Sequence, residues 1–270
     1  MKKIVEQNPA LNELLSQVAE IAQYLWQRGW AERNAGNISV NITHLVTASE
    51  FNKVSPSAPI ALGRTYPELA SCFFVVTGTG KRMRDLAKQP LYNALIIQLS
   101  EDGSSYHAFA DADADKNLKP TSELPSHLGI HQLIAQRGTP EKVILHTHAS
   151  ELVALTQHPQ IKDADTVNNI LWGMHPETSV FIPKGVGFVP YIMPGSEEIA
   201  MQTLLQLAEH DIVLWEKHGV FAIGNNVLDC FDNIDIACKS AHIYLTCKAA
   251  GFEPEGMKPD QLEALRNYVI

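Results

Sequence analysis

The stretch Val143-Ile144-Leu145-His146-Thr147-His148-Ala149 is an apolar run that ends in two histidines one residue apart. Its β-branched residues predict a strand, and side chains two positions apart on a strand point to the same face. Both imidazoles are therefore close enough to share one ion. The alternative is that His146 and His148 are half-buried strand-end residues that make hydrogen bonds and hold no metal.

A second segment has the same construction. Residues 211–219 form an apolar run that ends in His218 followed by Gly219. Three neutral imidazoles with an open coordination position make a catalytic rather than a structural zinc site, because substrate or water takes the open position. His218 is thus the candidate third ligand.

Size and composition describe an ordinary globular protein. The 270 residues suffice for one large domain or two small ones, and nothing requires two. The chain is 45% hydrophobic and 19% charged, with a formal net charge of -9. This charge provides no general attraction for nucleic acid or an anionic membrane, so an anionic substrate must be held by local donors.

The cysteines and the chain start bear on the compartment. Cys72, Cys230, Cys238 and Cys247 contain no Cys-x-x-Cys pair, which argues against a zinc cluster or a disulfide framework. Polar residues 6–9 interrupt any signal-peptide apolar region, and no stretch of about 18 apolar residues appears. The expected location is the reducing cytoplasm.

Two glycine-containing loops could bind an anion. The predicted strand 72–76 leads into Thr77-Gly78-Thr79-Gly80-Lys81, where backbone N–H groups can approach a phosphate. This loop matches neither the Walker nor the dinucleotide pattern. The other loop, residues 32–37, precedes a predicted strand at 38–42 and by itself is only turn chemistry.

Residues 120–127 contain a candidate catalytic acid. Thr121 or Ser122 is expected to cap a helix that runs through His131, with Glu123 in its first turn. Locally, Glu123 could be a surface acid that complements the helix dipole. However, it lies about 20 residues before the histidine pair, where a helix-strand return would bring it back.

The remaining pattern predicts an α/β sandwich, with a central sheet covered by helices on both faces. Residues 43–70 are expected to form a long irregular connection. Helices are expected at 9–29, 149–156, 196–207, 227–250 and 260–268, and strands at 93–99, 105–109, 179–182, 211–218 and 220–223.

Several motifs occur in a specific order: Asn34-Ala35-Gly36-Asn37-Ile38-Ser39, Thr77-Gly78-Thr79-Gly80-Lys81, Pro120-Thr121-Ser122-Glu123-Leu124-Pro125, His146-Thr147-His148 and His218-Gly219. Each motif is common by itself, but the ordered set resembles the class II aldolase/adducin family, most closely its bacterial branch that acts on rhamnulose 1-phosphate. The resemblance spans nearly the whole chain. It implies a single domain over 1–270, a three-layer sandwich around a mainly antiparallel sheet.

The resemblance also implies residue roles. His146, His148 and His218 match the ligands of one zinc ion per subunit, and Glu123 matches the catalytic carboxylate. Glu177 resembles a second acid contributed by the neighbouring subunit of a homotetramer. The positions that match phosphate-binding residues are Gly36, Asn37, Thr79, Gly80, Thr121 and Ser122, with Asn34 shaping the substrate loop.

One position departs from the family pattern. Ala35 stands where many relatives have glycine, and a positive φ there would cost an alanine roughly 1 kcal/mol.

The implied reaction is the reversible cleavage of L-rhamnulose 1-phosphate to dihydroxyacetone phosphate and L-lactaldehyde, as in rhamnose catabolism. Zinc would act as a Lewis acid and Glu123 would handle the C3 proton. Fuculose-phosphate cleavage and pentulose-phosphate 4-epimerisation stay open as alternatives within the family, as does a structural, adducin-like role. A Schiff-base aldolase would need a buried lysine, whereas the lysines here lie in polar surroundings.

Overall fold

Several strands of this protein are apolar runs that are buried on both faces. Every residue of β3 (Phe73–Thr77), β6 (Val143–Thr147) and β9 (Gly219–Gly224) is buried. Such runs are typical of a sheet covered on both sides by helices. The predicted strands at 72–76, at 143–147 and after His218 are therefore confirmed.

The computed structural model describes residues 1–51, 54, 56–111 and 117–267. They form two compact units. The first holds the described part of Met1–Leu145 together with Gly224–Leu228, and the second holds His146–Ile223 and the described residues from Asp229 onward. The expectation of a single domain stays a prediction. Within the described ranges, no helix has both the length and the apolar character needed to cross a membrane.

The other strands of the first unit are β1 (Asn37–Asn41), β2 (Ile60–Ala61), β4 (Ala94–Leu99) and β5 (Ser105–Phe109). The strand order is β2-β5-β4-β3-β1-β6. Neighbouring strands from β2 to β1 pair antiparallel, as in Ser39↔Val76 and Ile97↔Ala108. The hairpin predicted at 93–109 is confirmed.

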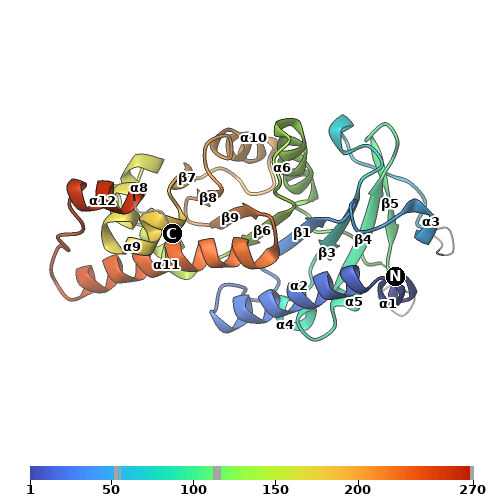
Figure 1. The fold of residues 1–270 in the computed structure, drawn as a ribbon, viewed down its shortest axis with the longest axis horizontal. Helices are drawn as coiled ribbons and strands as arrows, with labels where there is room; N and C mark the ends of the chain where they lie inside the picture. Colours follow the sequence, from blue (N-terminus) through green and yellow to red (C-terminus); the bar gives the residue numbers. More distant parts are fainter. Residues whose placement is uncertain (52–53, 55, 112–116, 268–270) are drawn as a thin grey trace. The chain divides into compact units, whose positions relative to one another are not determined.

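Helices lie on both faces of the strands of the first unit (Figure 1). Helix α6 (Leu124–Arg137) contributes Leu124 and Leu128 to a buried cluster with Phe74 and Leu95 from β3 and β4. Helix α2 (Pro9–Gln27) lies on the opposite face, and the Asn8 side chain caps it by accepting from the Leu11 N–H at 3.0 Å. The shorter helices of this unit are α1 (Lys2–Gln7), α3 (Ala48–Phe51), η1 (Pro67–Leu69), α4 (Met83–Leu86) and α5 (Pro90–Asn93).

In the second unit β8 (Ile212–Trp215) lies between β7 (Val186–Val189) and β9. The β7–β8 pair is parallel and the β8–β9 pair is antiparallel. Helices α10 (Glu197–Gln206) and α11 (Val227–Ala249) lie on opposite sides of these strands (Figure 1). The other helices are α7 (Ser150–Leu155), α8 (Ala164–Met174), α9 (Pro176–Phe181) and α12 (Pro259–Arg266). The mainly antiparallel, helix-covered sheet is thus confirmed.

Four predictions of elements need correction. The strand expected at 179–182 is wrong, because Pro176 starts α9 with a φ suited to a first helical turn, and buried Thr178 bonds Ser240 of α11 at 2.7 Å. The 43–70 connection includes α3, β2 and η1, while residues 52, 53 and 55 lie outside the described residues. The helix expected to end at 268 ends at Arg266, and residue 268 is also outside them.

The fourth correction concerns α6. Neither Thr121 nor Ser122 caps it: Glu123 is its N-cap residue, and no side chain provides a capping bond. The backbone N–H of Thr121 instead donates to Thr77 O, a residue of β3, at 2.8 Å. Glu123 therefore precedes the helix instead of lying inside its first turn.

Candidate active site

Three imidazoles converge in the second unit. His146 is in β6, His148 follows the end of this strand, and His218 lies between β8 and β9. One ring nitrogen of each lies within 4.8 Å of the others. The ring centroids are 5.4 Å apart for His146–His148, 5.2 Å for His146–His218 and 4.9 Å for His148–His218. The structure thus brings together the histidines that the sequence singles out.

The ring of His146 is held in one orientation. Its Nδ1 lies 3.1 Å from the carbonyl oxygen of Val220, which can only accept, so Nδ1 carries the proton and Nε2 presents its lone pair. Phe221 stacks on the ring at a centroid distance of 4.3 Å. A backbone carbonyl behind a ligating histidine is the usual means of fixing tautomer and direction. This arrangement fits a divalent cation.

The electrostatic surroundings favour neutral imidazole at His146. Its side chain is buried, and this burial, followed by the proximity of His148 and His218, holds the pKa of His146 well below its ordinary value of 6.5. Only the neutral ring binds metal, because protonation occupies the lone pair. Low pKa and fixed tautomer together make this histidine a competent ligand at neutral pH.

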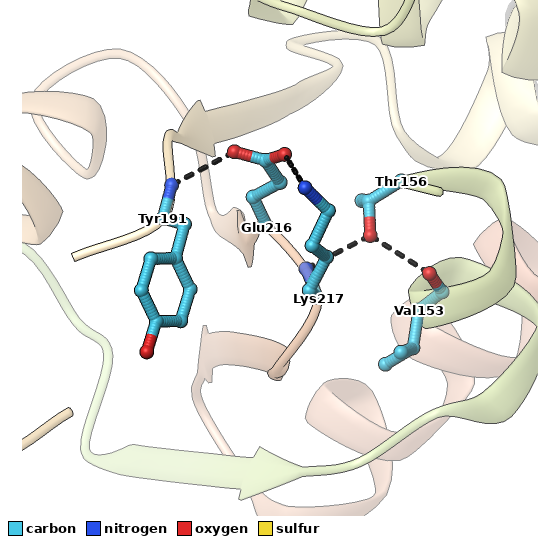
Figure 2. A network of polar contacts seen from close by, with 5 residues as sticks. All are labelled: Val153, Thr156, Tyr191, Glu216 and Lys217. Carbon is cyan, nitrogen blue, oxygen red and sulfur yellow. Dashed lines mark hydrogen bonds and ion pairs between the residues drawn. The ribbon is translucent and has the colours of Figure 1, made fainter. Parts of the chain in front are cut away.

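The turn that carries His218 is fixed by a polar network (Figure 2). The backbone N–H of Glu216 donates to Val189 O at 2.9 Å. Its carboxylate accepts from the backbone N–H of Tyr191 at 2.9 Å and pairs with Lys217 Nζ at 2.8 Å. These contacts lower the pKa of Glu216, the bond from Lys217 first and that from Tyr191 second. The turn is therefore anchored to the chain that follows β7.

Lys217 holds a strained backbone conformation. Its φ is 61°, in the left-handed region, which costs a non-glycine residue about 1–2 kcal/mol. Its backbone N–H donates to Thr156 Oγ1 at 2.9 Å, and that hydroxyl donates to Val153 O at 2.7 Å (Figure 2). Thr156 ends α7, the helix that begins just after His148. One hydrogen bond therefore connects the two segments that carry His148 and His218.

Gly219 is required by close packing. A Cβ at this position would lie 2.5 Å from Thr147 O and 3.1 Å from both His146 Cε1 and His148 Cδ2. No real Cβ tolerates the first of these distances without movement of the backbone. The glycine after His218 thus lets the start of β9 approach the histidine-bearing end of β6.

The candidate phosphate-binding segments lie side by side in the first unit. Gly78 forms a β-bridge with Pro120, and the backbone N–H of Thr79 donates to Lys119 O at 2.8 Å. Thr79, Gly80 and Ser122 are exposed, and Thr121 is buried. Residues far apart in sequence are brought together here, which is the arrangement a shared anion site needs.

The turn before β1 resolves the question raised by Ala35. Among the described non-glycine residues, positive φ occurs at Arg33, Ser71 and Lys217, so Ala35 bears no such strain, and the positive φ of 81° falls on Gly36. Asn34 is exposed in this turn. Asn37 is buried, and its Nδ2 donates to Glu123 Oε2 at 2.8 Å. Asn37 thus holds the candidate catalytic acid directly.

Glu177 lies in the first turn of α9 with half of its side chain exposed, and its Oε2 is 3.1 Å from His175 Nε2. Its predicted role at the active site of a neighbouring subunit stays a prediction.

The comparisons with known proteins agree with this geometry. The family model described as "Class II Aldolase and Adducin N-terminal domain" matches residues 16–245. The chain belongs to the class II aldolase and adducin family. Membership confirms the resemblance deduced from the ordered motifs.

The chain is similar to two relatives and one solved structure that are named aldolases. A rhamnulose-1-phosphate aldolase of Bacteroides thetaiotaomicron is 45% identical over 266 residues, covering 98% of this chain and 97% of that protein. A rhamnulose-1-phosphate aldolase of Yersinia pestis is 36% identical, covering 89% and 88%. The crystal structure of a sugar-phosphate aldolase from Thermotoga maritima matches with a TM-score of 0.78 at 30% identity. The match covers 92% of this chain and 100% of the Thermotoga chain.

Sequence reasoning missed the residues that support the site. Thr156 and Lys217 show no local signal, because their contact is tertiary. His127 could have been found, because it stands among apolar residues on the buried face of α6. Ser39 gives no such signal, because it occupies a polar position of the alternating sequence of β1.

Proposed function

We propose that this chain is a metal-dependent aldolase, a lyase that reversibly cleaves L-rhamnulose 1-phosphate to dihydroxyacetone phosphate and L-lactaldehyde. The cluster of His146, His148 and His218 carries the proposal, because it fits a divalent cation with a coordination position left for substrate. The activity named for the relative at 45% identity supplies the choice of sugar.

The three imidazoles would hold the cation, for which zinc is the best candidate given an all-nitrogen donor set. When bound, it supplies Lewis-acid stabilisation of the negative charge that develops on the ketone oxygen as the C3–C4 bond breaks. Because the imidazoles are neutral, they leave the cation its full charge.

Glu123 is the proposed proton-transfer group. It returns a proton to C3 after bond cleavage and removes that proton in the addition direction. The amide N–H of Asn37, 2.8 Å from its carboxylate, orients it. A Glu123→Gln protein should retain its metal and lose cleavage.

Local donors in place of lysines would hold the phosphate. The chain carries a net charge of -9, so backbone N–H groups and hydroxyls must do this work. The candidates are Asn34, Gly36, Asn37, Thr79, Gly80, Thr121 and Ser122, with the exposed Thr79 and Ser122 hydroxyls best placed to meet an incoming substrate.

The working form is proposed to be a cytoplasmic homotetramer in which Glu177 acts on the C4 oxygen at a neighbouring subunit's site. Large apolar side chains exposed between residues 191 and 205 support association: Tyr191 is 59% exposed, Met193 68%, Met201 58% and Leu205 60%. Glu177 itself is half exposed.

A substrate panel tests the proposal. The purified protein should release aldehyde faster from L-rhamnulose 1-phosphate than from L-fuculose 1-phosphate, and should form no new epimer from a pentulose phosphate. Chelator should abolish the release, and borohydride added with substrate should not. A His148→Ala protein should lose metal and activity, whereas His242→Ala, on the exposed face of α11, should keep both. Chelator-resistant cleavage or epimer formation would overturn the proposal.

A further inference from the structure

Helix α6 buries two histidines where packing alone calls for apolar residues. Leu124, His127, Leu128, His131 and Ile134 recur at helical spacing, and all are buried. His127 is 0% exposed and His131 2% exposed. A buried imidazole destabilises the fold unless it is hydrogen-bonded, so the partners of these two rings show what they are for.

The hydrogen-bond partners of these two rings are on β1, and the series of hydrogen bonds ends at Glu123. Asn37 and Ser39 are two residues apart on β1 and therefore face the same side. Ser39 Oγ lies 2.6 Å from His127 Nδ1 and 2.8 Å from His131 Nε2. The Nε2 atom of His127 bonds Asn37 Oδ1, and Asn37 Nδ2 donates to Glu123 Oε2 at 2.8 Å.

The direction of every hydrogen bond in this series can be assigned by starting at Glu123. Asn37 presents its NH₂ group to the carboxylate of Glu123 and therefore its Oδ1 to His127. His127 must then donate from Nε2 and accept at Nδ1 from the Ser39 hydroxyl. Ser39, having used its hydrogen, accepts from His131 Nε2–H. All donors point towards Glu123.

Burial and the neighbouring His127 hold the pKa of His131 well below its ordinary value of 6.5. His131 is therefore a neutral imidazole, and its one ring proton lies on Nε2, the atom that faces Ser39.

We propose that His127 is a positioning residue for Glu123, and that it acts by fixing the amide orientation of Asn37. Without the His127 Nε2–H, the Asn37 amide can rotate and present Oδ1 to the carboxylate, which repels it. Ser39 acts one step behind, because its hydroxyl selects the His127 tautomer. The inference rests on the proposed function, in which Glu123 moves the C3 proton.

The test compares two substitutions of one residue. His127→Phe keeps a planar aromatic ring, somewhat larger than imidazole, and removes the donor, whereas His127→Gln places an amide N–H near the former Nε2 position. The direct readout is exchange of the C3 hydrogen of dihydroxyacetone phosphate with deuterium oxide, which reports proton transfer without carbon-carbon cleavage. We expect His127→Phe to slow exchange and cleavage by about tenfold or more, with zinc content unchanged. His127→Gln should recover most of the rate.

A double-mutant comparison separates positioning from general damage. In a Glu123→Gln background, His127→Phe should cause no further loss of residual cleavage, because its effect passes through Glu123. If His127→Phe does not fold, Ser39→Ala provides the same test with a smaller change and an expected partial loss.

Wild-type exchange in the His127→Phe protein, equal impairment in His127→Gln, or additive losses in the double mutant would overturn the inference. A wild-type protein that neither exchanges nor cleaves would refute the proposed function, and the inference with it.

Discussion

Replacing Gly219 by alanine should damage the proposed metal site while all three histidines stay in the sequence. The added Cβ would stand 2.5 Å from Thr147 O and 3.1 Å from His146 Cε1 and His148 Cδ2. The first contact is with backbone, which cannot rotate away as a side chain can. Either β9 or the end of β6 must therefore move. The end of β6 carries His146, and β9 begins directly after His218, so either movement displaces a candidate ligand.

The expected magnitude follows from two separate effects. Overpacking a well-packed site costs about 1–3 kcal/mol, which would lower the melting temperature by roughly 2–4 °C per kcal/mol. Metal sites require ligand distances accurate to about 0.2 Å, and disturbing their supports typically lowers affinity by about 10–100-fold. We therefore expect a metal-free protein that is folded but less stable, and a weaker zinc complex.

The assay is zinc competition with a chromophoric chelator, alongside thermal melting of the metal-free protein. Gly173→Ala is the matched control, because its Cβ would meet nothing closer than 3.8 Å and the residue lies within α8. Alanine there should be neutral or stabilise the protein by up to about 1 kcal/mol. If Gly219→Ala binds zinc and melts like wild type, the close approach of β9 to β6 is not what positions the histidines.

Three further outcomes are expected. Thr156→Val removes the acceptor of the Lys217 N–H. It should weaken zinc binding several-fold and cost about 1 kcal/mol of stability, measured by urea unfolding with and without zinc. Unchanged zinc affinity would mean that the turn at Lys217 does not need this hydrogen bond. The folded-state pKa of His131 lies below its ordinary value of 6.5. As the pH falls below 6.5, the unfolded chain therefore takes up a proton that the folded protein does not bind. The free energy of unfolding should then drop by up to about 1.4 kcal/mol per pH unit. His131→Gln should flatten that slope, and an unchanged slope would assign it to other groups. Glu177→Gln should lower the cleavage rate with zinc content unchanged, and wild-type cleavage would remove Glu177 from the reaction.

Local sequence predicted that the candidate ligand histidines converge because strands impose a simple rule. The run before His146 is apolar and β-branched, and a strand places alternate residues on one face, so the convergence of His146 and His148 required no tertiary information. His218 was found in the same way, from a second run of the same kind. These predictions depend only on period, which the sequence displays directly.

Other features depended on contacts between distant segments. The β-branched residues of 179–182 favour a strand, yet Pro176 and the buried Thr178–Ser240 bond make the segment helical. Likewise, the left-handed Lys217 is explained only by Thr156, which lies 61 residues away. Pro176 was a local signal for the start of a helix, but no local pattern records a partner such as Ser240 or Thr156.

In the proposed reaction, a cation held by three histidines is needed for cleavage. Metal-free protein should be titrated with zinc while aldehyde release from L-rhamnulose 1-phosphate is followed. We expect no release at the start and a linear rise that saturates at one zinc per chain, with no rise in a His146→Ala protein. Full release before any zinc is added, or restoration in the His146→Ala protein at the same stoichiometry, would contradict it.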